Sequence, residues 1–232
     1  MTSDVIQTVS TSTVASQRIA GQLREDILSG VLQPGERIRQ EEVAAQFGAS
    51  RLPVREALRI LHSQGLIQLK ASSGAWVSRL DLAECEAIYK MRERLEPLAL
   101  AESIPHLDAN VLNDIDALQR EIESNDDQDR FLELDRELHL LCYAGNPIAE
   151  LNRMVQRFWD TTQSYRRAFV RVTGPQRMWV VNAEHRLLID AIRRRDISDG
   201  ERFLTAHIRR TRISLALHPE VFDVEAGGDD VT

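Results

Sequence analysis

The stretch ASRLPVREALRILHSQG, residues 49–65, limits the fold more than any other part of the chain, because it specifies a helix with two unlike sides. Ser50 is a favourable N-cap, since its hydroxyl can accept a hydrogen bond from a free N–H group of the first turn. Pro53 is tolerated in that turn, where N–H groups have no helical partner. The inward side follows the i, i+3, i+4, i+7 spacing of a buried helix face and comprises Val54, Ala57, Leu58 and Leu61.

A different side of this helix is basic. At 100° per residue its cationic side chains fall within an arc of roughly 80°, and they are Arg51, Arg55, Arg59 and His62. Two interpretations compete. A row of arginines can simply be solvated, or its planar guanidinium groups can pair with O6 and N7 of guanine. The neighbouring segments decide between them.

The segments before the basic helix are also helical. Ile19, Leu23 and Ile27 recur every four residues, which predicts a helix from Val14 to Gly30. A turn at the following Pro-Gly pair leads to a short helix across EEVAAQFG, which its glycine ends.

After the basic helix, two β-prone runs flank a Ser-Ser-Gly turn and predict a small hairpin, Leu66–Lys70 with Ala75–Ser78. Helix, short helix, basic helix and hairpin make a winged helix-turn-helix over residues 15–80. In such a fold the helix after the turn enters the major groove of DNA. The polar segment 1–14 ahead of it is expected to be flexible. The order of elements therefore favours DNA contact over a merely solvated basic face.

Charge is divided unevenly along the chain. Residues 1–80 contain nine Lys and Arg against seven Asp and Glu, a net +2, which leaves −9 for the remainder of a total of −7. Such asymmetry fits a protein that meets a polyanion with one part only. The two cysteines form no CxxC, and neither a long apolar run nor a secretory signal is visible. We therefore expect a cytoplasmic protein with reduced thiols and no membrane span.

From Asp81 onward the chain has few β-prone runs and almost no glycine, which is typical of an all-α bundle. The expected helices lie near 82–104, 108–124, 127–144, 147–170, 177–195 and 197–216. The predicted fold class is mainly α, with the winged helix-turn-helix followed by an effector-binding and dimerisation bundle over 81–217. An acidic, loose tail is expected over 218–232.

Three histidines and one aspartate of this bundle lie on inward helix faces. Asp135 and His139 are four residues apart on one face, and His185 and His207 have apolar neighbours on their own faces. Imidazole nitrogen and carboxylate oxygen from three helices suit Zn²⁺, Ni²⁺ or Mn²⁺, with an open position for water or a ligand. Taken singly, each histidine is better explained as a core residue bonded to a neighbour.

The segment ILSGVLQPGERI…EEVAAQFGASRLPVREALRILHSQGLI resembles the DNA-binding domain of GntR-family bacterial transcription regulators, over about residues 15–80. The resemblance implies that Arg51 and Arg55 contact operator bases and that Gly74, at the wing tip, approaches the minor groove. Leu52 departs from the family, which usually has Thr or another small residue there, and it offers only apolar contacts such as to a thymine methyl. The expected DNA-contacting residues are Ser50, Arg51, Leu52, Pro53, Arg55, Arg59 and Gly74.

The pattern D-x-x-x-H…GN…EH-x-x-x-x-x-AI-x-x-x-D…H resembles the FCD ligand-binding domain of the FadR subfamily of GntR regulators, over about residues 82–216. It implies a divalent metal, with an organic acid that coordinates the metal or lies beside it. YKMRERLEPLALA resembles the first FCD helix, whose arginine, here Arg92, faces the effector cavity and can pair with a carboxylate. The alternative for Arg92 is a surface pair with Glu96. The implied metal ligands are Asp135, His139, His185 and His207.

Together these features predict a metabolite-responsive transcription regulator, most often a repressor in this family. One winged helix reads one half-site, so a homodimer on a pseudo-palindromic double-stranded operator is expected. The main rival is a metal-dependent, hydrolase-like enzyme, because such a metal site can activate water, but no inward Glu or His is left over as a general base. A third interpretation is a DNA-binding protein with a purely structural metal.

Overall fold

The structure is a computed structural model that describes residues 2–70 and 74–222, with the backbone alone for residues 2–12 and 177. These residues form two compact units that divide between Arg79 and Leu80. Each unit has a hydrophobic core of its own. The division falls beside the boundary at residue 80 that the sequence predicts.

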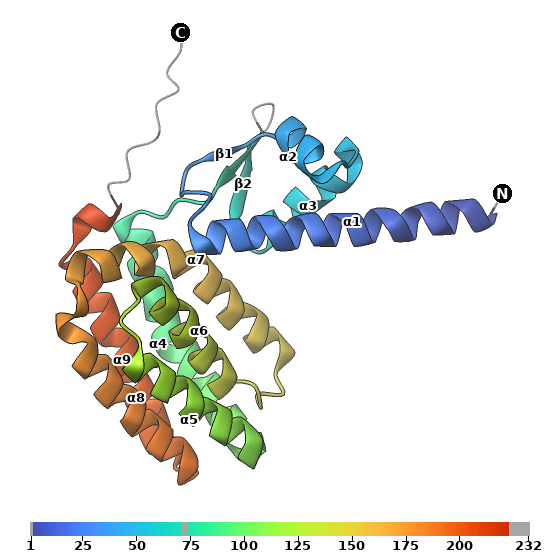
Figure 1. Cartoon of the computed structure of the whole chain (residues 1–232). Helices are drawn as coiled ribbons and strands as arrows, with labels where there is room; N and C mark the ends of the chain where they lie inside the picture. Colours follow the sequence, from blue (N-terminus) through green and yellow to red (C-terminus); the bar gives the residue numbers. More distant parts are fainter. Residues whose placement is uncertain (1, 71–73, 223–232) are drawn as a thin grey trace. The chain divides into compact units, whose positions relative to one another are not determined.

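The first unit is a three-helix fold with a small antiparallel sheet (Figure 1). Its sheet has the order β1-β3-β2, and β3 pairs with both neighbours. Its core joins the apolar faces of all three helices to the sheet. Its elements are α1 (Thr2–Ser29), β1 (Arg37–Ile38), α2 (Gln40–Phe47), α3 (Arg51–Ser63), β2 (Ile67–Lys70) and β3 (Gly74–Val77).

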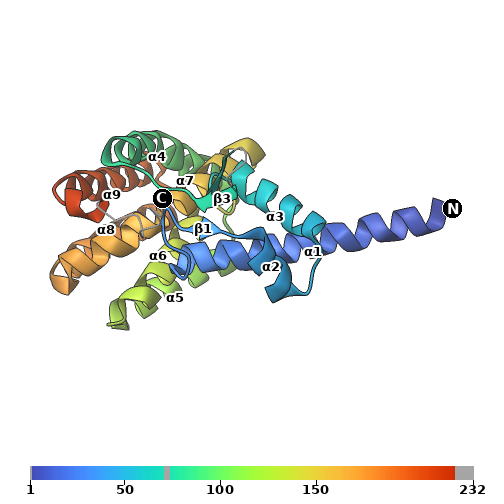
Figure 2. The ribbon, with the colours of Figure 1, turned by 90° about the horizontal axis from the view of Figure 1, so that it is seen from above.

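Helix α1 begins at Thr2 rather than at Val14, so the segment expected to be flexible is helical from Thr2 onward. Figures 1 and 2 show this N-terminal part of α1 projecting past α2 and α3. The apolar spacing that located the helix reports only its packed part, where Ile19 and Leu23 are buried. Extending an existing helix is easier than nucleating one, and no Pro or Gly interrupts the preceding residues.

Strand β1 was not predicted, because two residues are too short to give a periodic signal. It pairs with the central strand through Arg37 opposite Trp76 and Ile38 opposite Ala75. Buried Ile38 then closes the core of the unit.

The second unit is a bundle of helices, as expected, and the long helices fall within a few residues of the predicted ranges (Figure 1). Aspartate side chains accept first-turn N–H groups at the start of several of them, for example Asp81, Asp108 and Asp127, which fixes where those helices begin. The long helices are α4 (Leu82–Ser103), α5 (Ala109–Ser124), α6 (Gln128–Cys142), α7 (Ala149–Thr173), α8 (Met178–Arg193) and α9 (Ile197–Ala216).

Short 3-10 turns occupy some of the joints between these helices. They are η1 (Ile104–His106), η2 (Pro175–Arg177) and η3 (Pro219–Phe222). The last falls in the tail that was expected to be loose from residue 218. There the ring of Phe222 stacks on Tyr165 at 5.0 Å, and Val221 is buried beside it. Burial of two apolar side chains therefore extends the bundle to Phe222, and residues 223–232 lie outside the described residues.

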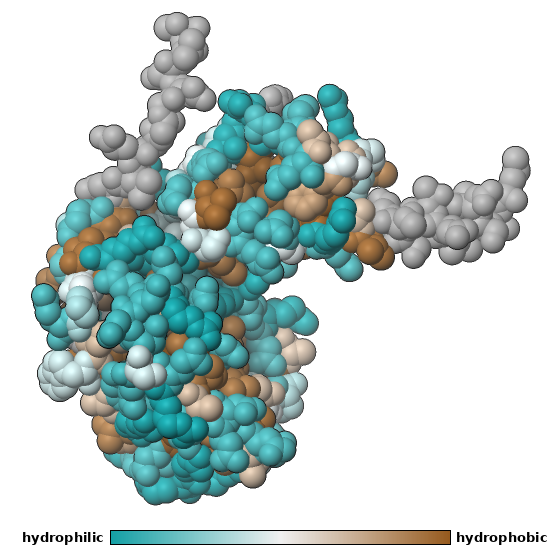
Figure 3. Space-filling model, viewed as in Figure 1, coloured by the Kyte–Doolittle hydropathy of each residue, from teal (hydrophilic) through white to brown (hydrophobic). Residues whose placement is uncertain are grey.

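Both cysteines are free and buried. Burial raises the pKa of the Cys85 thiol and of the Cys142 thiol to about 12. Among the described residues, no helix is both long and apolar enough to cross a membrane. The surface of the helical bundle in the view of Figure 3 is mainly hydrophilic, with scattered apolar side chains.

Candidate nucleic-acid interface and metal centre

Exposed cations line one side of α3. Arg51 is 78% exposed, and its guanidinium lies 3.5 Å from the carboxylate of Glu41 in α2. Arg59 pairs with Glu56 at 2.7 Å. Arg55 is exposed and makes no hydrogen bond or ion pair within the residues that the structure describes. Exposed ion pairs contribute little to stability, so all three guanidinium groups are available to an anion.

The remaining residues predicted on this helix divide between surface and core. Leu52 is 52% exposed beside the arginines and is available for apolar contact. Ser50 has the extended backbone of an N-cap, but its side chain makes no capping hydrogen bond, contrary to expectation. Pro53 is buried against the core, which corrects its assignment as a DNA-contacting residue. It lies in the first turn of α3, where its missing N–H group would have no helical partner.

A further group of cations lies on the sheet. Arg37 and Lys70 each approach the ring of Trp76, at 5.5 and 4.9 Å from cation to ring centroid. Gly74 begins β3 with φ +110°, a conformation that side chains rarely adopt. The rest of the expected Ser-Ser-Gly turn falls on residues 71–73, outside the described residues. No local sequence pattern predicted this group, because only the strand register places Arg37 opposite Trp76.

The four predicted metal ligands come together inside the second unit. Asp135 and His139 lie on α6, His185 on α8 and His207 on α9, and one ligand atom from each lies within 4.8 Å of the others. Donors around one ion bound at about 2.0–2.2 Å lie roughly 3–4.4 Å apart. The cluster is therefore close to the size of a single metal site.

Hydrogen bonds orient two of the imidazoles. His185 Nδ1 lies 2.8 Å from Gln119 Oε1, and His207 Nδ1 lies 2.9 Å from Glu184 Oε2. The Gln119 amide nitrogen donates to Glu123 and Asn182, so its oxygen is the atom that faces His185 and accepts from it. The proton is thus held on Nδ1, and Nε2 keeps its lone pair for a metal.

The donor atoms of the cluster are arranged as they would be around a bound cation. Nε2 of His185 lies 3.3 Å from Asp135 Oδ1, so two acceptor atoms face each other. Neither ring nitrogen of His139 has a hydrogen-bond partner among the described residues. Burial lowers the pKa of His139 well below its usual value and lowers the pKa values of His185 and His207, which keeps all three imidazoles neutral at pH 7. Neutral, unpartnered imidazole nitrogens beside a carboxylate fit a divalent metal.

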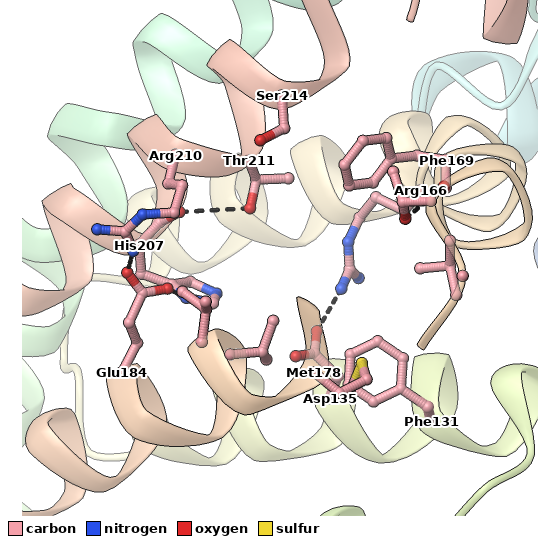
Figure 4. A pocket seen from close by; sticks show the side chains of 15 residues that line it. Phe131, Asp135, Arg166, Phe169, Met178, Glu184, His207, Arg210, Thr211 and Ser214 are labelled. Carbon is pink, nitrogen blue, oxygen red and sulfur yellow. Dashed lines mark hydrogen bonds and ion pairs between the residues drawn. The ribbon is translucent and has the colours of Figure 1, made fainter. Parts of the chain in front are cut away.

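A cavity of about 90 Å³ borders the cluster (Figure 4). Asp135 and His207 form part of its wall, whereas His139 and His185 do not line it. A water molecule needs roughly 10–15 Å³ of such space, so the cavity has room for one small organic molecule. An ion held by the four residues would therefore be open to the cavity on the side of Asp135 and His207.

Arg92 does not line this cavity, which corrects its predicted place in the effector site. Its guanidinium is buried, donates to Glu96 at 2.5 Å and to Thr162 at 3.2 Å, and lies over the rings of Tyr89 and Trp159. The alternative of a surface pair with Glu96 is also wrong, because both members of the pair are buried. Arg92 thus neutralises the buried Glu96 carboxylate.

Other ionisable residues of the cavity wall were missed by the sequence reasoning. Arg166 of α7 donates to Asp135, and Glu184 of α8 accepts from His207 and pairs with Arg210 of α9. Glu184 precedes His185 directly, so its inward position contradicts the expectation that no inward Glu accompanies the histidines. Arg166 carried no local signal, because only the packing of α7 against α6 brings it to Asp135.

Comparison with known proteins agrees with both units. The family described as bacterial regulatory proteins, gntR family, matches residues 15–77, and the FCD domain family matches residues 87–210, which is more than half of the chain. The chain is a GntR-type regulator with an FCD domain. Its first unit is therefore a DNA-binding domain, and its relatives are transcription regulators rather than enzymes, so the hydrolase interpretation is set aside.

Relatives of this GntR regulator match it over most of their own length. YdhC of Bacillus subtilis strain 168, an uncharacterised HTH-type transcriptional regulator, is 26% identical over 190 residues, which cover 80% of this chain and 84% of YdhC. The transcriptional repressor RspR of Escherichia coli K12 is 27% identical over 209 residues, covering 84% of this chain and 86% of RspR.

Solved structures show the same fold. McbR/YncC of E. coli superposes with a TM-score of 0.76 at 21% identity, covering 88% of this chain and 98% of that one. A GntR-family regulator from Pseudomonas syringae pv. tomato strain DC3000 is 29% identical with a TM-score of 0.56, and the match covers 89% of this chain and 86% of that one.

Proposed function

We propose that this GntR regulator is a repressor whose operator affinity responds to a small organic acid bound beside a divalent metal in the FCD domain. One observation supports it most: Asp135 and His207 belong both to the cluster of metal ligands and to the wall of the cavity. A molecule in the cavity would reach the open side of the metal. The metal, when bound, supplies a Lewis-acidic position for a carboxylate oxygen.

On the DNA side, the exposed row of Arg51, Arg55 and Arg59 on α3 is the proposed reading surface. Arginine pairs with guanine through O6 and N7, and Leu52 offers an apolar contact to a thymine methyl. Ser50, at the start of α3, and Gly74, at the start of β3, are proposed as further DNA contacts.

The working form is proposed to be a homodimer in the bacterial cytoplasm, where the operator is. Two copies related by a two-fold axis would read half-sites about 34–36 Å apart, or a multiple of that distance. RspR is named as a repressor, and this favours repression over activation here. Reciprocity of linkage requires that an acid which weakens operator binding binds less tightly to the DNA-bound protein.

The test is genomic footprinting of the zinc-loaded protein, followed by gel-shift titration of the bound sites with and without candidate organic acids. We expect pseudo-palindromic sites and a loss of affinity for them when the acid is present. Bound sites whose affinity no acid changes, together with a metal that only raises thermal stability, would favour a purely structural metal. Absence of any sequence-specific site would contradict the regulator role itself.

A further inference from the structure

Arg166 is a buried cation with unused donors at the cavity. Its Nη2 donates to Asp135 Oδ2, its Nη1 lies 3.4 Å from Gln163, and its guanidinium covers the ring of Trp159 at 4.5 Å. A guanidinium carries five N–H donors in a planar fork, and the others have no partner among the described residues. Figure 4 shows the head group inside the cavity, directed toward Asp135.

Arg92, in contrast, is not placed to take a ligand in this cavity. Its donors are directed to Glu96 and Thr162, and rings of Tyr89 and Trp159 cover its guanidinium. Both arginines lie over Trp159, but only Arg166 lines the cavity. The choice between them therefore follows from which one keeps free donors at the wall.

The ionisable groups of the cavity balance one another before a metal binds. Asp135 and Glu184 carry two negative charges, and their partners Arg166 and Arg210 carry two positive ones. A divalent ion would leave the site with a net charge of about +2, which favours an anionic ligand.

The rest of the wall is largely apolar. In the view of Figure 4, the rings of Phe131 and Phe169 lie on the same side of the cavity as Arg166, and Glu184 and Arg210 lie on the other. The other apolar residues of the wall are Val170, Met178, Val180 and Val181. The hydroxyl groups of Thr173, Thr211 and Ser214 also belong to the wall, and Arg210 is already paired with Glu184. A ligand with several carboxylates would still bring some of them against the apolar side chains, at a large cost in free energy. A single carboxylate on a short apolar body suits both parts of the wall.

We propose that Arg166 anchors the carboxylate of the ligand, and that the ligand class is a small monocarboxylate with an apolar body. This assignment rests on the proposed metal site and deepens it. Because one arm of the guanidinium holds Oδ2 of Asp135 while Oδ1 faces the imidazoles, the same side chain contacts both a metal ligand and the organic acid. Arg166 therefore couples metal binding to acid binding.

Calorimetric titration of the zinc-saturated, full-length protein tests this assignment. The probes are butyrate and benzoate, their neutral amides butyramide and benzamide, and citrate as a polar tricarboxylate. We expect one or both monocarboxylates to bind about tenfold or more tightly than the matching amide and than citrate, because a charge-assisted hydrogen bond is lost with the amide. Binding of citrate alone, or of none of the carboxylates, would overturn the ligand class.

Variants then assign the role to Arg166. Arg166→Lys keeps a positive charge beside Asp135 but loses the fork, and Arg166→Gln loses both. We expect both variants to weaken monocarboxylate binding about tenfold or more, and zinc affinity to fall further in Arg166→Gln than in Arg166→Lys. Arg171→Gln, on the same helix but exposed and outside the cavity wall, is the matched control and should leave both affinities unchanged.

An unchanged monocarboxylate affinity in zinc-saturated Arg166→Lys would exclude Arg166 as the anchor, even if Arg166→Gln does not fold. Failure of the proposed function looks different. In that case the wild-type protein itself would bind no zinc in a competition titration against a chelating dye, or no operator in a gel shift.

Discussion

Arg55 is a single side chain that is available to bind DNA. It is exposed on α3, between Arg51 and Arg59, and it has no partner within the residues that the structure describes. Arg51 and Arg59 form weak surface ion pairs with Glu41 and Glu56, and these pairs compete with DNA. Among the described residues, Arg55 has no such pair to break. The largest share of specific binding is therefore expected from this position.

Substituting Arg55→Ala should cost about 1–3 kcal/mol of specific operator binding and relax the base preference at one position of each half-site. Gel-shift titration against the operator and single-base variants at fixed salt measures both effects. Arg120→Ala, an exposed arginine of α5, is the control and should change neither. Uniform weakening on every sequence, with a smaller salt dependence, would instead identify a phosphate contact.

At the scale of the element, glycines set how closely the joints between helices can pack. After α6, Gly145 packs against the end of α4. A β-carbon there would lie 2.6 Å from the Ser103 carbonyl oxygen and 3.1 Å from the His106 β-carbon. The clash is with backbone, which cannot rotate away as a flexible side chain can.

Gly145→Ala should destabilise the helical bundle by about 1–3 kcal/mol. The measurement is urea denaturation, analysed at the unfolding transition of the bundle. Gly21→Ala is the matched control, because its position in α1 has nothing within 4 Å of the added carbon. Alanine there should stabilise α1 by roughly 0.5–1 kcal/mol. If Gly145→Ala left the stability of the bundle unchanged or raised it, the close approach to Ser103 would not exist in solution.

At the scale of the whole molecule, metal binding should be coupled to folding. The four ligands come from three helices that are far apart in the sequence, so the unfolded chain cannot present them together. A ligand that binds only the folded state stabilises it in proportion to the logarithm of its concentration.

Zinc at one hundred times its dissociation constant should raise the free energy of unfolding by about 2.7 kcal/mol. Differential scanning calorimetry, with chelator and zinc in separate runs, measures the shift. The double variant His185→Ala, His207→Ala should lose both the shift and the bound metal by elemental analysis. His106→Ala, an exposed histidine outside the cluster, should keep both. A zinc-dependent shift that survives the double variant would place the metal elsewhere.

The sequence by itself determined the elements and the residue types of both sites. The scarcity of glycine and of β-prone runs predicted the long helices of the bundle, and the two unlike faces of α3 placed Arg51 and Arg55 outside the core. These are local properties, because a helix fixes the direction of each side chain from its position along the chain. Polar caps and the full length of α1 were missed, since a packed stripe reports only the part of a helix that is buried.

Only the tertiary structure decided the surroundings of each charge. Arg92 looked like the effector anchor, but packing of α4 against α7 buries it between aromatic rings and commits it to Glu96. Arg166 reaches Asp135 across 31 positions of sequence, and Gln119 reaches His185 across 66. The energy of a buried charge depends on partners brought from distant helices. No local pattern encodes that, so the charged wall of the cavity is defined only once the helices are packed together.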